Sequence, residues 1–188
     1  MKKKPFHKAL RILLITNGLV LIAGAMLYPI YALYVEKIGG DLLDASLTGG
    51  FFALAAGLTT LFAGKYADKD SKDPKIVVWG YSIMGIGFLM YVFVNSIWFL
   101  FGVQMLIGFA EAFYSPAFDA LYSKHLSKHK AGSEWGAWES INYFSIAVGA
   151  VIGGFIAKYL GFNMIFILMA ILCFSSAMYI YSLRKGLL

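Results

Sequence analysis

The segment that decides the fold is IVVWGYSIMGIGFLMYVFVNSIWFLFGVQMLIGFAEAFYSPAF, residues 76–118, which is 43 residues long and has Glu111 as its single charged residue. A helix needs about 20 apolar residues to cross the hydrocarbon core of a bilayer. The segment is therefore too long for one crossing and long enough for two. The polar pair Asn95-Ser96 provides a turn between them, so the segment predicts two consecutive transmembrane helices.

Similar apolar runs on both sides extend this pattern to the whole chain, which is 60% hydrophobic and 14% charged over 188 residues. A soluble domain of this size would need more polar surface. The runs are continuously apolar rather than alternating, which favours helices over a transmembrane β-barrel. We predict one all-α, polytopic membrane domain, residues 1–188, with six transmembrane helices at about residues 10–34, 46–65, 75–95, 97–121, 134–157 and 161–183.

Lysine and arginine fall almost entirely on one side of the predicted bilayer. If the chain changes sides after each helix, 14 of the 16 lie on the side of the termini, and only Lys37 and Lys158 lie on the other. The positive-inside tendency then predicts that both termini and residues 64–75 are cytoplasmic, in a multi-pass protein of the plasma (inner) membrane. Topology and contact with anionic membrane lipid explain the net charge of +6, so we expect no nucleic-acid partner.

The loops are short and leave little room for a catalytic domain. They contain no Gly-rich phosphate loop, no paired catalytic carboxylates and no Ser/His/Asp arrangement, so we expect neither an enzyme nor a cofactor. His125 and His129 have a spacing that places them on one helix face, but no carboxylate or Cys beside them completes a metal site. We expect a solvated interfacial helix there and no metal. Cys173 is expected to be a small buried hydrophobic residue of the sixth helix.

Polar residues within the fourth span form a stripe. Polar groups in hydrocarbon are costly, so each is a candidate site. Gln104, Glu111 and Ser115, with Gly108 between them, lie on one helix face, and we interpret that face as lining a water-filled cavity. A packing hydrogen bond is the alternative for a single polar residue. Glu111 lies about 12 Å from the cytoplasmic end of its helix and is a candidate for proton coupling.

The first span carries a second stripe. Asn17, Tyr28 and Tyr31 fall on one face and are further candidates for the substrate cavity. Tyr28 and Tyr31 lie near the outer end of the span, where an interfacial aromatic belt is the alternative interpretation. Pro29 predicts a bend because its missing N–H interrupts the helical ladder.

The fifth span brings Glu139 and Asn142, one turn apart, to a similar depth in the cytoplasmic half of the membrane. Glu139 is a second candidate for proton coupling, with simple solvation at the interface as the alternative. Two spans also carry small residues four apart, a pattern typical of close helix contacts. These residues are Gly49, Ala53 and Gly57 in the second span, and Ser145, Gly149 and Gly153 in the fifth. Two such rows on non-adjacent spans suggest a shared seam, and ordinary packing within one bundle is the alternative.

The charged stretch after the second span comprises residues 64–69, GKYADK, followed by Lys72. This stretch resembles G-x-L-A-D-R-x-G-R-K, the motif that joins the second and third spans in the major facilitator superfamily of transporters. Tyr66, Ser71 and Asp73 depart from the pattern.

Two further segments are similar to motifs of the same family. Residues 104–112, QMLIGFAEA, resemble the fourth-span motif R-x-x-x-G-x-G-x-A, with Gln104 in place of the arginine. Residues 149–154, GAVIGG, resemble the fifth-span antiporter motif G-P-x-x-G-G, with Ala150 in place of the proline. Residues 28–40 also look like drug efflux members, so the resemblance covers the whole chain in order.

The resemblance implies the six-span N-terminal half of a twelve-span fold, built from two inverted three-helix repeats. It implies that spans one and four line the cavity, that two and five form the seam between halves, and that three and six lie outside. The gating loop implied by the resemblance comprises Gly64, Asp68, Lys69 and Lys72. The half-half seam would contain the two rows of small residues named above.

The function implied is secondary transport of a small, drug-like organic substrate by efflux or antiport, with proton coupling through Glu111 or Glu139 as an option. Because the chain matches only six spans, a second copy in a parallel homodimer would complete the family's arrangement for alternating access. The alternatives are a non-transporting or heteromeric six-span subunit and a truncated half of a larger transporter.

Overall fold

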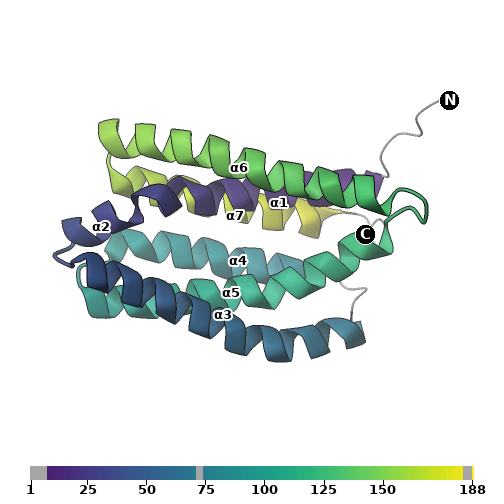
Figure 1. Cartoon of the computed structure of the whole chain (residues 1–188), viewed down its shortest axis with the longest axis horizontal. Coiled ribbons are helices and arrows are strands. Elements are labelled where there is room, and N and C mark those ends of the chain that lie inside the picture. The colour runs from purple at the N-terminus through teal and green to yellow at the C-terminus, as the bar shows by residue number, and fades with distance from the viewer. Residues whose placement is uncertain (1–7, 71–73, 184–187) are drawn as a thin grey trace.

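The computed structural model describes residues 8–70, 74–183 and 188, and side chains at all of these except 66–70. Among these residues, all regular structure is helical, and six helices are long and apolar enough to cross a membrane. The helices run alternately up and down, so α1 begins and α7 ends at the same end of the bundle (Figure 1). The predicted six-helix, all-α membrane fold is confirmed.

The first span is interrupted at the predicted proline. It consists of α1 (Lys8–Leu27), a 3-10 turn η1 (Tyr28–Ile30) and α2 (Tyr31–Lys37), with Pro29 at the centre of η1. Proline cannot donate to the α-helical ladder, which explains the change of helix type there. The other spans are α3 (Leu42–Asp70), α4 (Lys75–Met90) with η2 (Tyr91–Phe93), α5 (Ile97–Lys124), α6 (Ala131–Tyr159) and α7 (Phe162–Ser182).

Local sequence sets the starts of two of these helices. Asp41 and Asp44 each accept a hydrogen bond from the other's backbone N–H, at 2.9 and 3.0 Å, so that α3 begins at Leu42 in a reciprocal cap. Ser96 accepts a hydrogen bond from Phe99 N–H at 3.3 Å and caps α5. The turn expected at Asn95-Ser96 is therefore present.

The segment expected to be a gating loop is largely helical. Helix α3 continues through Gly64, Asp68 and Lys69 to Asp70, because residues 64–70 contain no proline to stop it. A Cβ added to Gly64 would meet no atom within 4 Å. The side chains of Asp68 and Lys69, and all of Lys72, lie outside the described residues.

The small residues of α6 contact α1 of the same chain. Ser145 Oγ donates to the Gly18 carbonyl at 3.3 Å, and a Cβ on Gly149 would lie 2.7 Å from the Ala25 Cβ. A Cβ on Gly153 would overlap the Met26 carbonyl oxygen. Small side chains let two helix backbones approach closely, and here they join α6 to α1. Within one chain, Ser145, Gly149 and Gly153 thus show the packing inside one bundle that was the alternative interpretation, and a half-half seam at these residues stays a prediction.

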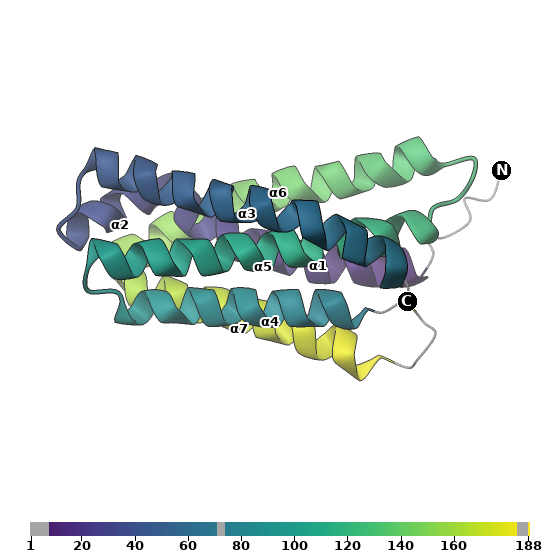
Figure 2. The same ribbon diagram turned by 90° about the horizontal axis from the view of Figure 1, so that it is seen from below.

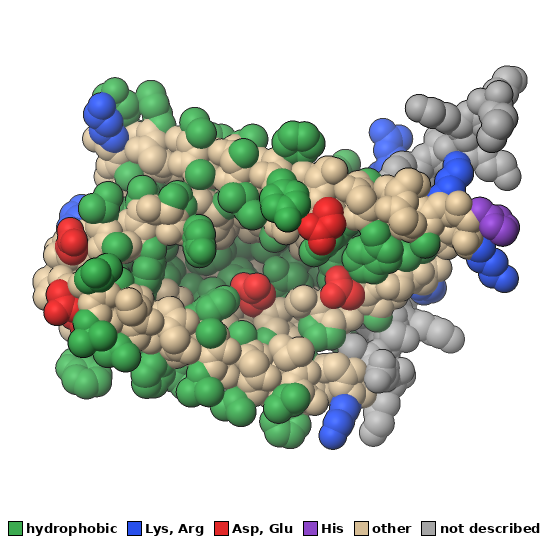
Figure 3. All heavy atoms as spheres, in the orientation of Figure 1, with side chains coloured by type: hydrophobic (Ala, Val, Ile, Leu, Met, Phe, Trp, Pro, Cys, Tyr) green, Lys and Arg blue, Asp and Glu red, His purple; other side chains and the backbone are tan. Residues whose placement is uncertain are grey.

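The small residues of α3 are placed differently. Ala53 and Gly57 are exposed, and Gly49 lies at the edge of a cavity described below. Only 11% of the span in α3 and 17% of the span in α6 is buried, against 67% of the span that begins with α1. Helices α3 and α6 flank one face of the bundle, and α4 and α7 form the opposite side (Figure 2). The face between α3 and α6 is hollowed, with acidic side chains among apolar ones (Figure 3).

Candidate functional site

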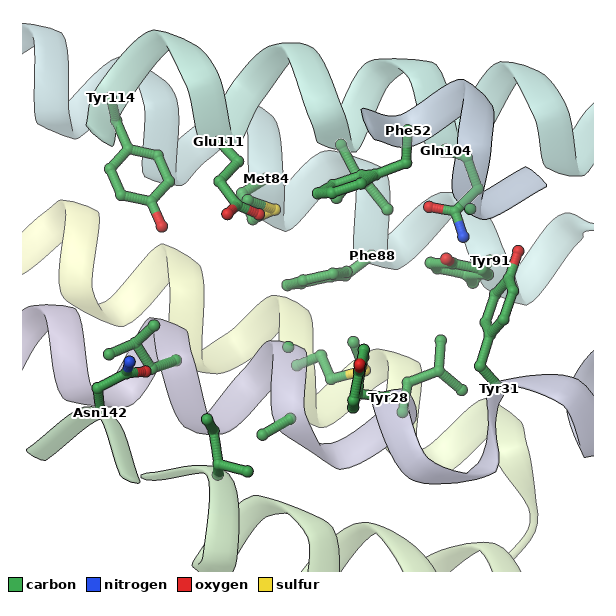
Figure 4. A pocket seen from close by; sticks show the side chains of 18 residues that line it. Tyr28, Tyr31, Phe52, Met84, Phe88, Tyr91, Gln104, Glu111, Tyr114 and Asn142 are labelled. Carbon is green, nitrogen blue, oxygen red and sulfur yellow. The ribbon is translucent and has the colours of Figure 1, made fainter. Parts of the chain in front are cut away.

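A cavity of about 630 Å³ opens within the hollowed face, and all six spans contribute to its wall (Figure 4). Helices α1, α5 and α4 with its η2 turn provide most of the lining. The lining residues are Leu21, Gly24, Ala25, Leu27, Tyr28, Tyr31, Gly49, Phe52, Met84, Phe88, Tyr91, Gln104, Ile107, Glu111, Tyr114, Asn142, Ile146 and Met169.

Helix α5 supplies the most polar part of this wall. Gln104, Ile107, Glu111 and Tyr114 are separated by three, four and three residues, and therefore follow one helix face. Glu111 is exposed to the cavity and is the single charged residue among the lining side chains. Since no Lys or Arg among the described residues lines the cavity, this wall can attract a cation or hold a proton, and it offers no positive charge to a bound anion.

The stripe expected on α5 divides into two faces. Gly108 packs against α3, where an added Cβ would overlap the Phe52 carbonyl oxygen. This close approach joins α3 and α5 and brings Phe52 into the cavity wall. Ser115 is half-buried and does not line the cavity.

The candidates in the first span also divide. Tyr28, which is 83% exposed, and Tyr31 line the cavity from η1 and α2. Asn17 does not: its side chain is 4% exposed, and its Oδ1 accepts a hydrogen bond from Tyr81 Oη at 3.1 Å. Asn17 therefore packs α1 against α4, although its spacing in the sequence places it on the same helix face as Tyr28 and Tyr31.

The fifth span contributes Asn142, which lies on the far wall of the cavity from Glu111 (Figure 4). Glu139, one turn earlier, is exposed but is not part of the lining. Of the two candidates for proton coupling, only Glu111 lies in the cavity.

At one end of the cavity, hydrogen bonds connect the first two spans, and a side chain of the fourth span lies beside them. Tyr31 Oη donates to Thr48 Oγ1 at 2.7 Å, and Thr48 Oγ1 in turn donates to the Asp44 carbonyl at 2.8 Å. The Gln104 amide lies beside the same Tyr31 hydroxyl (Figure 4). The hydrogen bond between Tyr31 and Thr48 ties α2 to α3 and holds Tyr31 at the cavity wall.

The third span was expected to lie outside, yet it contributes three large lining residues. Met84, Phe88 and Tyr91 are spaced four and three apart, on one face of α4 and η2. Gly87 allows α5 to approach, because an added Cβ would lie 2.6 Å from Ile107 Cγ1. Helix α7 contributes Met169. The 84–88–91 spacing is visible in the sequence, but apolar side chains at helical spacing do not distinguish a cavity wall from a packed core.

The wall thus combines one carboxylate and two amide side chains with tyrosine and phenylalanine rings. Apolar and aromatic surface with a few placed polar groups is typical of a small-molecule site. Aromatic faces attract cations, and a carboxylate adds to that attraction. The cavity can hold a solute with an apolar body and a positively charged or hydrogen-donating group.

The chain is similar to known membrane transporters over most of its length. It is 27% identical over 160 residues to an uncharacterized MFS-type transporter of Methanocaldococcus jannaschii, which covers 85% of this chain and 41% of that protein. It is 26% identical over 179 residues to the multidrug resistance protein MdtG of Dickeya zeae, covering 92% and 43%. It is 22% identical over 154 residues to the proton-coupled antiporter flippase LtaA of Staphylococcus epidermidis, covering 78% and 37%.

The chain spans less than half the length of these relatives. The family model of the Major Facilitator Superfamily matches residues 13–186, which include all six spans. The chain therefore belongs to the Major Facilitator Superfamily.

Proposed function

We propose that this chain forms one half of an alternating-access transporter for small organic solutes, and that two copies in a parallel homodimer form the complete transporter. The observation that carries the proposal is the open cavity with Glu111 in its wall. A carboxylate facing lipid would be costly. A second six-span unit over this face would enclose the cavity and keep Glu111 in water or in contact with a solute.

The lengths of the relatives support a partner of the same size. The chain covers 41% of one transporter and 43% of another, so a second unit of similar length would account for most of the remainder. Because six spans return the chain to its starting side, two copies in the same orientation have the topology of a twelve-span protein. The faces of α3 and α6 beside the cavity are largely unburied and are available to such a partner.

Helix packing supports two inverted three-helix repeats within the chain. Helix α3 packs against α5, α6 against α1, and α4 against α7; α4 also contacts α5, and α1 contacts α7. Exchanging the first three spans with the last three interchanges the α3–α5 contact with the α6–α1 contact and the α4–α5 contact with the α7–α1 contact, and it leaves the α4–α7 contact unchanged. A pseudo-symmetric pair of triplets would give this pattern.

The transported solute in this proposal is drug-like, and the direction is efflux. The names of two relatives, a multidrug resistance protein and a proton-coupled antiporter flippase, support export by antiport. Glu111 would alternate between holding a proton and holding a cationic solute, because one carboxylate cannot neutralise both at once. Its place in the cavity wall supports this role.

The homodimer is tested by cysteine crosslinking in the membrane. A two-fold axis in front of the cavity places α3 of one copy beside α6 of the other, so the double variant Gly57→Cys/Phe144→Cys, at two exposed positions of α3 and α6, is expected to form a disulfide between copies in a background that also carries Cys173→Ala. Met178→Cys is the matched control, because it is exposed on α7, on the opposite side of the bundle. Native mass spectrometry in nanodiscs should give twice the mass of one chain.

Transport itself is tested by uptake of a lipophilic cation into proteoliposomes with a pH gradient. Crosslinked dimers with pH-dependent flux support the proposal. A strict monomer without flux would refute it. A monomer that gains flux only with a different six-span chain would favour the heteromeric subunit.

A further inference from the structure

Tyr31 Oη, Thr48 Oγ1 and the Asp44 carbonyl form a row of hydrogen bonds at one end of the cavity, here called the hydroxyl chain. The direction of each hydrogen bond in it is fixed. Thr48 has one hydroxyl proton, and that proton is shared between the carbonyls of Asp44, at 2.8 Å, and Ala45, at 3.1 Å. Carbonyl oxygens only accept hydrogen bonds. Thr48 Oγ1 must therefore accept from Tyr31, at 2.7 Å, and this uses the single proton of the Tyr31 hydroxyl.

The orientation of Gln104 follows from this direction. Since the proton of Tyr31 is given to Thr48, the Tyr31 oxygen can only accept, and the amide nitrogen of the neighbouring Gln104 is a donor from which it can accept. The Gln104 amide lies beside the Tyr31 hydroxyl, with its other end toward the cavity interior (Figure 4). The cavity is therefore offered the Oε1 carbonyl, which is a hydrogen-bond acceptor.

We propose that Tyr31 and Thr48 are positioning residues that fix Gln104 as an acceptor, so that the cavity selects cationic solutes bearing a second N–H or O–H donor. The inference rests on the proposed solute-binding function of this cavity. Gln104 and Glu111 are seven residues apart on α5, a rise of about 10 Å. The selected solute then has its positive charge at Glu111 and its donor about two helical turns away, with an apolar or aromatic body between them.

A pair of probes isolates the donor. The first is (8-hydroxyoctyl)trimethylammonium, and the second is its (8-methoxyoctyl) counterpart, which has the same charge and chain but can only accept at its far end. Binding of each tritiated probe is measured by scintillation proximity on the full chain in nanodiscs, with empty nanodiscs subtracted. We expect the wild-type protein to bind the hydroxyl probe about fivefold more tightly, the effect of one net hydrogen bond.

Two substitutions should remove this preference by raising the affinity for the methoxy probe, which binds more weakly to wild type. In Thr48→Val, the Tyr31 proton loses its acceptor and turns to the Gln104 carbonyl, so the amide flips and offers its NH2 group to the cavity. In Tyr31→Phe, the amide is free to rotate. The methoxy probe should then bind about fivefold more tightly than to wild type, while the hydroxyl probe changes little because a hydroxyl both donates and accepts. General damage to the site would weaken both probes.

Matched variants complete the test. Thr48→Ser keeps the hydroxyl chain and should keep the wild-type ratio. Tyr34→Phe should keep it too, because that hydroxyl donates to the Tyr91 carbonyl instead of contacting Gln104. Gln104→Leu removes both the donor and the acceptor of the amide. The ratio of the two probes in this variant therefore measures any effect of the extra methyl group of the methoxy probe.

The outcomes separate the two proposals. If Thr48→Val and Tyr31→Phe are monodisperse and retain the wild-type ratio, the positioning role is refuted while cation binding stands. A wild-type ratio equal to that of Gln104→Leu refutes it as well. If neither probe binds to wild type, both the positioning role and the solute cavity are refuted.

Discussion

Gly153→Ala tests which surface the small residues of α6 serve. The added Cβ would lie 2.6 Å from Met26 Cα and would overlap the Met26 carbonyl oxygen, whereas ordinary contacts begin near 3.4 Å. These are backbone atoms of α1 and cannot rotate away, so the two helices must separate. Overpacking of this kind costs about 1–3 kcal/mol. We expect the free energy of unfolding of Gly153→Ala to lie below that of a glycine-to-alanine variant without this overlap by about that amount.

The neighbouring residue provides a matched control. Gly154→Ala adds the same methyl group to the same helix, but nothing lies within 4 Å of its Cβ. Both variants gain the same intrinsic helix propensity, about 1 kcal/mol over glycine. The difference between them therefore isolates the contact between α6 and α1.

Unfolding is followed by far-UV circular dichroism as dodecyl sulfate is added to mixed micelles, and oligomeric mass is measured on the same samples. Gly153→Ala should unfold at a lower mole fraction of dodecyl sulfate than Gly154→Ala, with both retaining the oligomeric mass of wild type while folded. Equal stability of the two variants, with the oligomer lost only in Gly153→Ala, would refute the intramolecular contact and return Gly153 to an interface between chains.

Three further substitutions have defined expected results. Glu111→Gln keeps the shape of the cavity wall but removes its charge, so binding of a lipophilic monocation in nanodiscs should weaken at least tenfold, and unchanged binding would exclude Glu111 as the cation site. Tyr81→Phe leaves the buried Asn17 carbonyl without its donor and should lower the free energy of unfolding by about 1–3 kcal/mol without changing probe affinity; a lost affinity would instead connect Asn17 with the cavity. Glu134→Ala removes the acceptor of two hydrogen bonds, from Ser127 N–H at 2.7 Å and Ser127 Oγ at 2.9 Å, and should lower the thermal unfolding midpoint, with Ser133→Ala on the exposed side of the same turn as a control of small effect.

The sequence was sufficient for the fold because hydrocarbon imposes one simple requirement on every span. A run of about 20 apolar residues has few alternatives to a transmembrane helix. The cap formed by Asp41 and Asp44, which starts α3 at Leu42, is a local feature that the apolar pattern alone does not include. The continuation of α3 to Asp70 was missed for a similar reason, because charge density was interpreted as a loop.

The site was harder because spacing identifies a helix face but not what covers that face. Ser145, Gly149 and Gly153 predict a close helix contact, and they make one, but the partner is α1 of the same chain. Asn17 and Gln104 are both polar residues inside the bundle. Asn17 accepts a hydrogen bond from Tyr81 and is buried, whereas Gln104 lines the cavity. A single sequence contains no information about such pairings across more than sixty residues.

In the proposed homodimer, every lining residue occurs twice around one two-fold axis. A twelve-span single chain can place an acidic group in one half and a different residue at the equivalent position of the other half. Two identical chains cannot, so any solute on the axis meets two Glu111 carboxylates and two Gln104 acceptors. A single monocation then neutralises only one carboxylate, and the other keeps a proton or a second cation. Symmetry in this way couples protonation to solute binding, and it favours solutes with donors at both ends.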